Sequence, residues 1–167
     1  MWATEPGKLK LEYLMMTKRF FSFFLAAGFT LLSGSLGAAE PAMTVYKTKT
    51  CGCCGKWVEH MRTNGFTVNV KEVESMDETH RQFGVPDKLV SCHTGIIAGY
   101  AVEGHVPAAE VRRMLKEKPK AKGLAVPGMP MGSPGMEQGP RKDTYFVLLF
   151  DEKGETKEYQ KYPLKQP

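Results

Sequence analysis

The sequence predicts a single α/β domain, and three observations lead to that prediction. Segments with strand-like alternation and segments with a helical apolar face follow one another in the order βαβαββα between residues 43 and 118. A short cysteine-rich motif lies where the first predicted strand passes into the first predicted helix. Two further β-prone segments near the C-terminus predict a β-hairpin. We therefore expect one mixed sheet with a cysteine site at a strand-to-helix junction.

The first 39 residues are expected to lie outside this domain, as an N-terminal extension and a secretory signal peptide. Two basic residues precede an apolar run, residues 20–32, and small residues end at Ala39. Met15 or Met16 is an alternative start of the chain. The apolar run is shorter than the roughly 20 residues that cross a bilayer. We expect export with cleavage after Ala39 and no stable membrane span afterwards, and an uncleaved anchor is the alternative.

Residues 40–167 are enough for one compact domain and too few for two. They carry 19 basic and 16 acidic residues, a net charge of +3. No dense basic run with interleaved aromatic residues occurs, so nucleic acid is not expected as a partner.

The expected elements follow from local patterns. The predicted strands are residues 43–47, 66–71, 92–97, 100–106, 144–150 and 156–159, and the predicted helices are residues 56–64, 76–83 and 107–118. A capping box, Ser75–Glu78, opens the second helix. Residues 123–136 are dense in glycine and proline, carry three methionines, and are expected to form neither a regular helix nor a central strand. We interpret them as an ordered loop lying over the cysteine site.

Three of the four cysteines, Cys51, Cys53 and Cys54, fall within four residues, and Cys92 follows far downstream. Cysteines in exported proteins usually form structural disulfides. Bridges between neighbours are strained, so only Cys51 to Cys54, or one of the three to Cys92, has comfortable geometry. A structural disulfide would leave the other thiols crowded beside it, which favours a metal site. The N-terminus of a helix also favours thiolate over thiol.

The element order resembles that of a thioredoxin-like fold. In that architecture the loop before the third strand lies beside the N-terminus of the first helix. Cys92 falls on this loop and is therefore expected near the other three thiols. Thioredoxins usually carry a cis-proline at this position, so a cysteine there favours metal binding over ordinary thioredoxin chemistry.

The spacing of the thiols favours Cu(I) over zinc. A structural Zn²⁺ usually has four tetrahedral ligands in two well-separated pairs, although Cys51, Cys54, Cys92 and His93 could supply them. Cu(I) is softer and prefers thiolate and thioether sulfur. Because one thiolate can bridge two Cu(I) ions, crowded cysteines suit a multinuclear cluster.

Several accessory residues have two interpretations. His93 is expected as a ligand or close neighbour of the metal. Met129 and Met136, with Met131 between them, are either copper ligands in a lid or core fillers. His105 is either a ligand or a hydrogen-bonding residue at the start of a helix. The remaining expectations are that Trp57 is core and that His60 and His80 face solvent.

Four motifs in order resemble the CopG-type copper-resistance family, formerly a domain of unknown function. They are Cys51-Gly52-Cys53-Cys54, Ser91-Cys92-His93-Thr94, Glu103-Gly104-His105-Val106-Pro107, and residues 123–130 continuing to Gly135-Met136-Glu137. The resemblance covers residues 43–159. It implies a periplasmic copper-homeostasis protein with a thioredoxin-like domain and a cysteine-bridged copper cluster on Cys51, Cys53, Cys54 and Cys92. It also implies interconversion of Cu(I) and Cu(II), with copper ions and other periplasmic copper-handling proteins as partners.

Two other functions remain open. An envelope thiol-disulfide oxidoreductase would use Cys51 as the attacking thiolate and Cys54 as the resolving thiol, which leaves Cys53 and Cys92 idle. A zinc-structured interaction module is the third candidate.

Overall fold

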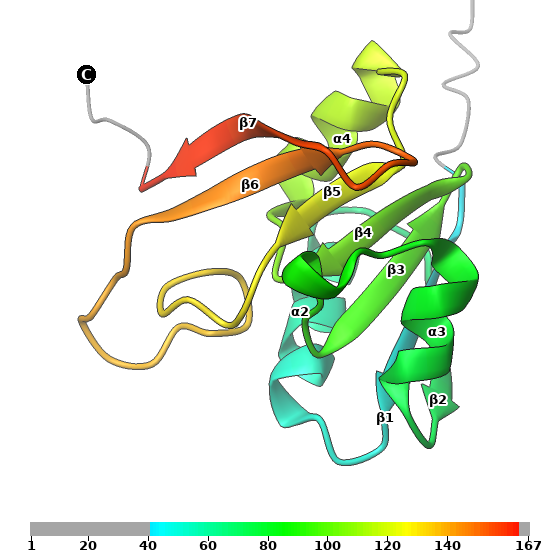
Figure 1. Cartoon of the computed structure of the whole chain (residues 1–167). Coiled ribbons are helices and arrows are strands. Elements are labelled where there is room, and N and C mark those ends of the chain that lie inside the picture. The colour runs from blue at the N-terminus through cyan, green and yellow to red at the C-terminus, as the bar shows by residue number, and fades with distance from the viewer. Residues whose placement is uncertain (1–40, 164–167) are drawn as a thin grey trace, which may run out of the picture. The chain divides into compact units, whose positions relative to one another are not determined.

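A computed structural model of the protein describes residues 41–163, which form one seven-stranded mixed sheet in the order β2-β1-β3-β4-β5-β6-β7 (Figure 1). The strands are β1 (Met43–Thr48), β2 (Val68–Val73), β3 (His93–Ile97), β4 (Tyr100–Gly104), β5 (Gly123–Val126), β6 (Tyr145–Phe150) and β7 (Thr156–Tyr162). The helices are α2 (Gly52–Thr63), α3 (Met76–Phe83), α4 (Ala108–Glu117) and the short 3-10 helix η1 (Asp87–Leu89). The predicted α/β class is confirmed.

The predicted extension and signal peptide, residues 1–39, lie outside the described residues. No helix within residues 41–163 has the length and apolar character needed to cross a membrane.

The first four strands follow the predicted order closely. β1 pairs in parallel with β2 and antiparallel with β3, and β3 pairs antiparallel with β4. The predicted hairpin turn at Ala98 and Gly99 is present, and both residues have positive φ. The predicted C-terminal hairpin is also confirmed, because β6 and β7 pair antiparallel.

One prediction about the sheet is wrong. Residues 123–126, expected as part of a loop, form β5, a fully buried central strand between β4 and β6. The high glycine and proline content of residues 123–136 favoured a loop, although residues 123–126 are an apolar run without proline. Gly123 is required there, because a Cβ at this position would lie 1.8 Å from the carbonyl oxygen of Ala101. The loop therefore begins only at Pro127.

Helices cover both faces of the sheet (Figure 1). α2 and α4 pack on one face, where Trp57, Met61, Val111 and Met114 are fully buried in the larger apolar core. α3 and η1 lie on the other face. α2 begins earlier than predicted, because Cys51 itself is the N-cap residue and accepts a hydrogen bond from the amide of Cys54 at 3.4 Å. The first turn of α2 therefore contains the cysteine motif.

His60 and His80 were predicted to face solvent, and this prediction is wrong because both side chains contact other parts of the fold. His60 Nε2 accepts a hydrogen bond from the backbone amide of Ala108 at 3.1 Å, and it thereby caps the first turn of α4. His80 is buried on α3, with its Nε2 3.2 Å from a carboxylate oxygen of Glu103. Tertiary contacts that the helical pattern does not encode bring both side chains inward.

The contact between His80 and Glu103 predicts a pH-dependent contribution to stability. The hydrogen bond to Glu103 raises the pKa of His80, although burial opposes the increase. A histidine whose pKa is higher in the folded state stabilises the fold below its unfolded pKa of about 6.5, and this stabilisation is lost as pH rises through the folded pKa.

We expect His80→Gln to lower the free energy of unfolding more at about pH 6 than at about pH 9. Urea denaturation of the wild type and the variant at the two pH values measures the difference. His93 and His105 are present in both proteins, so their contributions to the pH dependence subtract out. An equal loss at both pH values would contradict the prediction.

Candidate metal site

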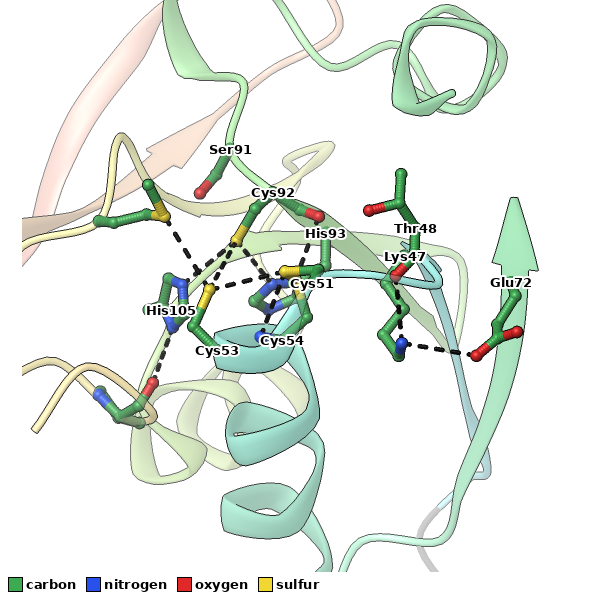
Figure 2. Close-up of a disulfide and its surroundings, with 12 residues drawn as sticks. Lys47, Thr48, Cys51, Cys53, Cys54, Glu72, Ser91, Cys92, His93 and His105 are labelled. Carbon is green, nitrogen blue, oxygen red and sulfur yellow. Dashed lines mark hydrogen bonds and ion pairs between the residues drawn. A yellow bond between two sulfur atoms is a disulfide. The ribbon is translucent and has the colours of Figure 1, made fainter. Parts of the chain in front are cut away.

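The four cysteines come together at the N-terminal end of α2, as the sequence predicts. Cys51 caps the helix, Cys53 and Cys54 lie in its first turn, and Cys92 immediately precedes β3. The sulfur atoms of Cys53 and Cys92 are 3.9 Å apart, and those of Cys51 and Cys53 are 3.5 Å apart (Figure 2). All four sulfurs lie within 4.8 Å of one another. We call these four residues the thiol cluster.

The structure holds the thiol cluster in a half-oxidised form. Cys51 and Cys54 are joined by a disulfide, whereas Cys53 and Cys92 are free. The sequence favoured a metal site over a structural disulfide, and the pair that is bridged is one of those predicted to have comfortable spacing. The N-cap turn accounts for it, because it places the two Cα atoms 5.4 Å apart, within the range that a disulfide spans. Reduction of this bond is required before Cys51 and Cys54 can bind a metal as thiolates.

A second group of donors shares Cys92 with the thiol cluster. The Cys92 sulfur is 3.4 Å from Nδ1 of His93 and 3.3 Å from Nε2 of His105 (Figure 2). These three ligand atoms also lie within 4.8 Å of one another. We call Cys92, His93 and His105 the mixed site. The placement of His93 beside the thiols agrees with the sequence-based expectation.

The orientation of His105 is fixed by a loop from elsewhere in the chain. Its Nδ1 lies 2.8 Å from the carbonyl oxygen of Pro134, which can only accept a hydrogen bond, so Nδ1 carries the proton. Nε2 of the neutral ring therefore presents its lone pair toward Cys92. Burial lowers the pKa of His105, which keeps the ring neutral and competent to bind a metal. The sequence left this residue ambiguous because the contacting carbonyl is 29 residues away.

His93 is fully buried between aromatic neighbours. Its ring centroid lies 4.4 Å from that of Trp57 and 5.0 Å from that of His105. Burial lowers the pKa of His93 well below its usual value, and the neighbouring His105 adds to the decrease. Trp57 is core, as predicted, and its indole nitrogen donates to the carbonyl oxygen of Val106 at 2.9 Å. The ring of His93 is therefore held rigidly in its neutral form.

The shared cysteine is held mainly as a thiol in the metal-free protein. Burial raises the pKa of Cys92 to about 12, and the nearby Cys53 contributes to the increase. A metal that binds Cys92 as a thiolate must therefore displace a proton.

Residues 127–136 form an ordered loop beside the site, as predicted, and we call it the lid loop. Met129 is 53% exposed, and its sulfur lies 4.0 Å from that of Cys53. A Cβ on Gly135 would lie 2.9 Å from the backbone of Cys53, so only glycine allows the loop to pack this closely on α2. Met136 is buried in the same loop, and its role as a ligand stays a prediction.

The fold and site together define an α/β protein with a sulfur- and imidazole-rich site whose donor atoms could hold a metal ion. The family model described as "Protein of unknown function, DUF411" matches residues 89–136. That span contains Cys92, His93, His105 and the lid loop, whereas Cys51, Cys53 and Cys54 precede it.

Two solved structures match the chain over almost their whole length. One, titled "Copper resistance protein copG- Form 2", is 44% identical, with a TM-score of 0.71, and the match covers 74% of this chain and 99% of that chain. The other, titled "Copper resistance protein copG- Form 1", is 43% identical, with a TM-score of 0.70, and the match covers 75% and 99%. No curated protein matches. The chain belongs to the CopG copper-resistance family.

Proposed function

We propose that this protein is a periplasmic copper-binding protein of copper resistance, which holds Cu(I) on the thiol cluster as a multinuclear centre. The observation that carries the proposal is the convergence of four cysteine sulfurs within 4.8 Å, beside two buried imidazoles and the thioether of Met129. Soft sulfur donors favour Cu(I), and bridging thiolates allow several ions to share the cluster. The copper-resistance titles of the similar structures support the same metal.

We further propose that residues 40–167 form a single thioredoxin-like domain, exported by a signal peptide within residues 1–39. The strand order β2-β1-β3-β4, with β1 and β2 parallel and the other two pairs antiparallel, supports the thioredoxin-like assignment. The basic, apolar and small-residue segments before Glu40 support export. A disulfide within the site also suits an oxidising compartment.

The disulfide and the mixed site together suggest how Cu(I) and Cu(II) could be interconverted. Two Cu(II) ions would each take one electron from the thiols of Cys51 and Cys54, giving one disulfide, two Cu(I) ions and two protons. The reverse reaction consumes the disulfide and two protons and returns two Cu(II) ions. Imidazole nitrogen suits Cu(II) better than thioether does, so His93 and His105 are suited to the oxidised ion and Met129 to the reduced one.

We expect the exported and fully reduced protein to take up more than one Cu(I) ion per chain. An anaerobic Cu(I) titration, with metal analysis and the ultraviolet absorption of thiolate bound to Cu(I), measures the stoichiometry. Competition with Zn²⁺ tests selectivity, and Cu(I) is expected to be retained. Binding of at most one Cu(I), or a preference for Zn²⁺, would contradict the proposed cluster.

The Cys51–Cys54 disulfide at a helix N-terminus also favours a second candidate, an envelope thiol-disulfide oxidoreductase. That function needs neither Cys53 nor Cys92. An insulin-reduction assay separates the two functions, because only an oxidoreductase would keep its activity in the Cys53→Ser and Cys92→Ser variants.

A further inference from the structure

Ser91, the residue before Cys92, is hydrogen-bonded in two directions at once. Its backbone amide donates to a carboxylate oxygen of Glu103 at 2.6 Å. Its hydroxyl donates to the carbonyl oxygen of Gly128, in the lid loop, at 2.8 Å. Figure 2 shows Ser91 directly above Cys92 in the chain segment that leads into β3. One residue therefore connects the segment that carries Cys92 with the loop that carries Met129.

The inner end of this connection is rigid. Glu103 is fully buried on β4. Its carboxylate also accepts a hydrogen bond from the hydroxyl of Thr94 on β3 at 2.6 Å and lies 3.2 Å from Nε2 of His80. Three separate elements therefore fix the carboxylate, and the backbone of Ser91 is fixed with it.

At the other end of this connection, Met129 is the more flexible residue. Met129 follows Gly128 directly and is half exposed. Its unbranched side chain can adopt many rotamers. The contact between its sulfur and that of Cys53 therefore depends on where the backbone of the lid loop is held. The hydroxyl of Ser91 bonds to that backbone one residue away from Met129.

We propose that Ser91 is a positioning residue, a latch that holds Met129 over the thiol cluster and thereby sets the rate at which bound Cu(I) leaves the protein. This inference rests on the proposed copper function. With the latch closed, the thioether covers the cluster on its exposed side. With the latch open, Met129 moves away, and an external Cu(I) acceptor reaches the cluster. The amount of copper bound at saturation does not depend on the latch, because the four cysteine thiolates stay in place when Met129 moves away.

Release of Cu(I) from the loaded, reduced protein to an excess of a coloured Cu(I) chelator tests the latch. We expect Ser91→Ala to release copper about five-fold faster at unchanged copper content, since one net hydrogen bond corresponds to about 1 kcal/mol. Met129→Leu should also accelerate release. In the Met129→Leu background, Ser91→Ala should cause no further acceleration, because the latch then has no thioether to hold.

Ser75→Ala is the matched control. It also removes one serine hydrogen bond, at the N-cap of α3, and its expected release rate is that of the wild type. Release from Ser91→Ala at the wild-type rate would overturn the latch, and so would equal acceleration by Ser91→Ala in both backgrounds. A wild-type protein that takes up no Cu(I) would instead overturn the proposed function, and the latch with it.

Discussion

Cys92→Ser is expected to abolish multinuclear copper loading, because Cys92 belongs to both donor groups. Its sulfur lies 3.9 Å from that of Cys53 and within 3.4 Å of one nitrogen on each of His93 and His105. Replacing an outer-shell partner of a metal ligand already lowers affinity by about 10–100-fold. Loss of this shared ligand should cost at least as much. Copper content and the ultraviolet absorption of thiolate bound to Cu(I) measure the effect.

Two comparisons make this result interpretable. Met76→Leu removes a sulfur from α3, on the opposite face of the sheet, and should load copper as the wild type does. Cys53→Ser should reduce loading but leave the mixed site intact. If Cys92→Ser retains full copper content while remaining folded by circular dichroism, the shared-ligand interpretation is wrong.

Glu103→Ala is expected to have the largest effect on stability, about 3–5 kcal/mol. The carboxylate is fully buried and serves the amide of Ser91, the hydroxyl of Thr94 and the ring of His80. Its removal leaves these polar groups without an acceptor in the interior and opens a cavity beside them. Urea denaturation of the copper-free, disulfide-bonded protein measures the loss.

Glu103→Gln keeps the measurement possible if the alanine variant does not fold. The amide retains the shape and one acceptor oxygen but lacks the negative charge beside His80. We expect a smaller loss than for alanine, together with loss of the stability difference between about pH 6 and about pH 9 that His80 contributes. A loss below about 1 kcal/mol for Glu103→Ala would mean that the buried network is not stabilising.

Local patterns were sufficient for most of the fold. Alternation predicted β1, β2 and the two hairpins, and apolar spacing with capping signals predicted α3 and α4. Ser75 caps α3 through the amide of Asp77, and Gly84 ends it in a left-handed conformation. The error at β5 arose because a four-residue buried strand is too short to be distinguished within a segment rich in glycine and proline.

Side chains whose roles depend on distant partners were predicted less well. His80 has a helical position that resembles a solvated one, yet it is buried against Glu103 on β4. His105 becomes a well-oriented donor only because the lid loop supplies the carbonyl of Pro134. Nothing in the residues next to either histidine encodes these partners.

The available chemistry can be identified from the amino-acid sequence: three thiols at a helix start, a fourth thiol with an adjacent histidine, and a methionine-bearing loop. Their crowding was visible because the cysteines are neighbours in the chain. Which of these donors come into contact depends on the folded chain. The antiparallel pairing of β3 with β1 and β4 places Cys92 and His105 beside α2, and the lid loop returns to orient His105 and hold Met129. These contacts span up to 76 residues, so they depend on sheet registry and loop packing, which short-range patterns do not specify.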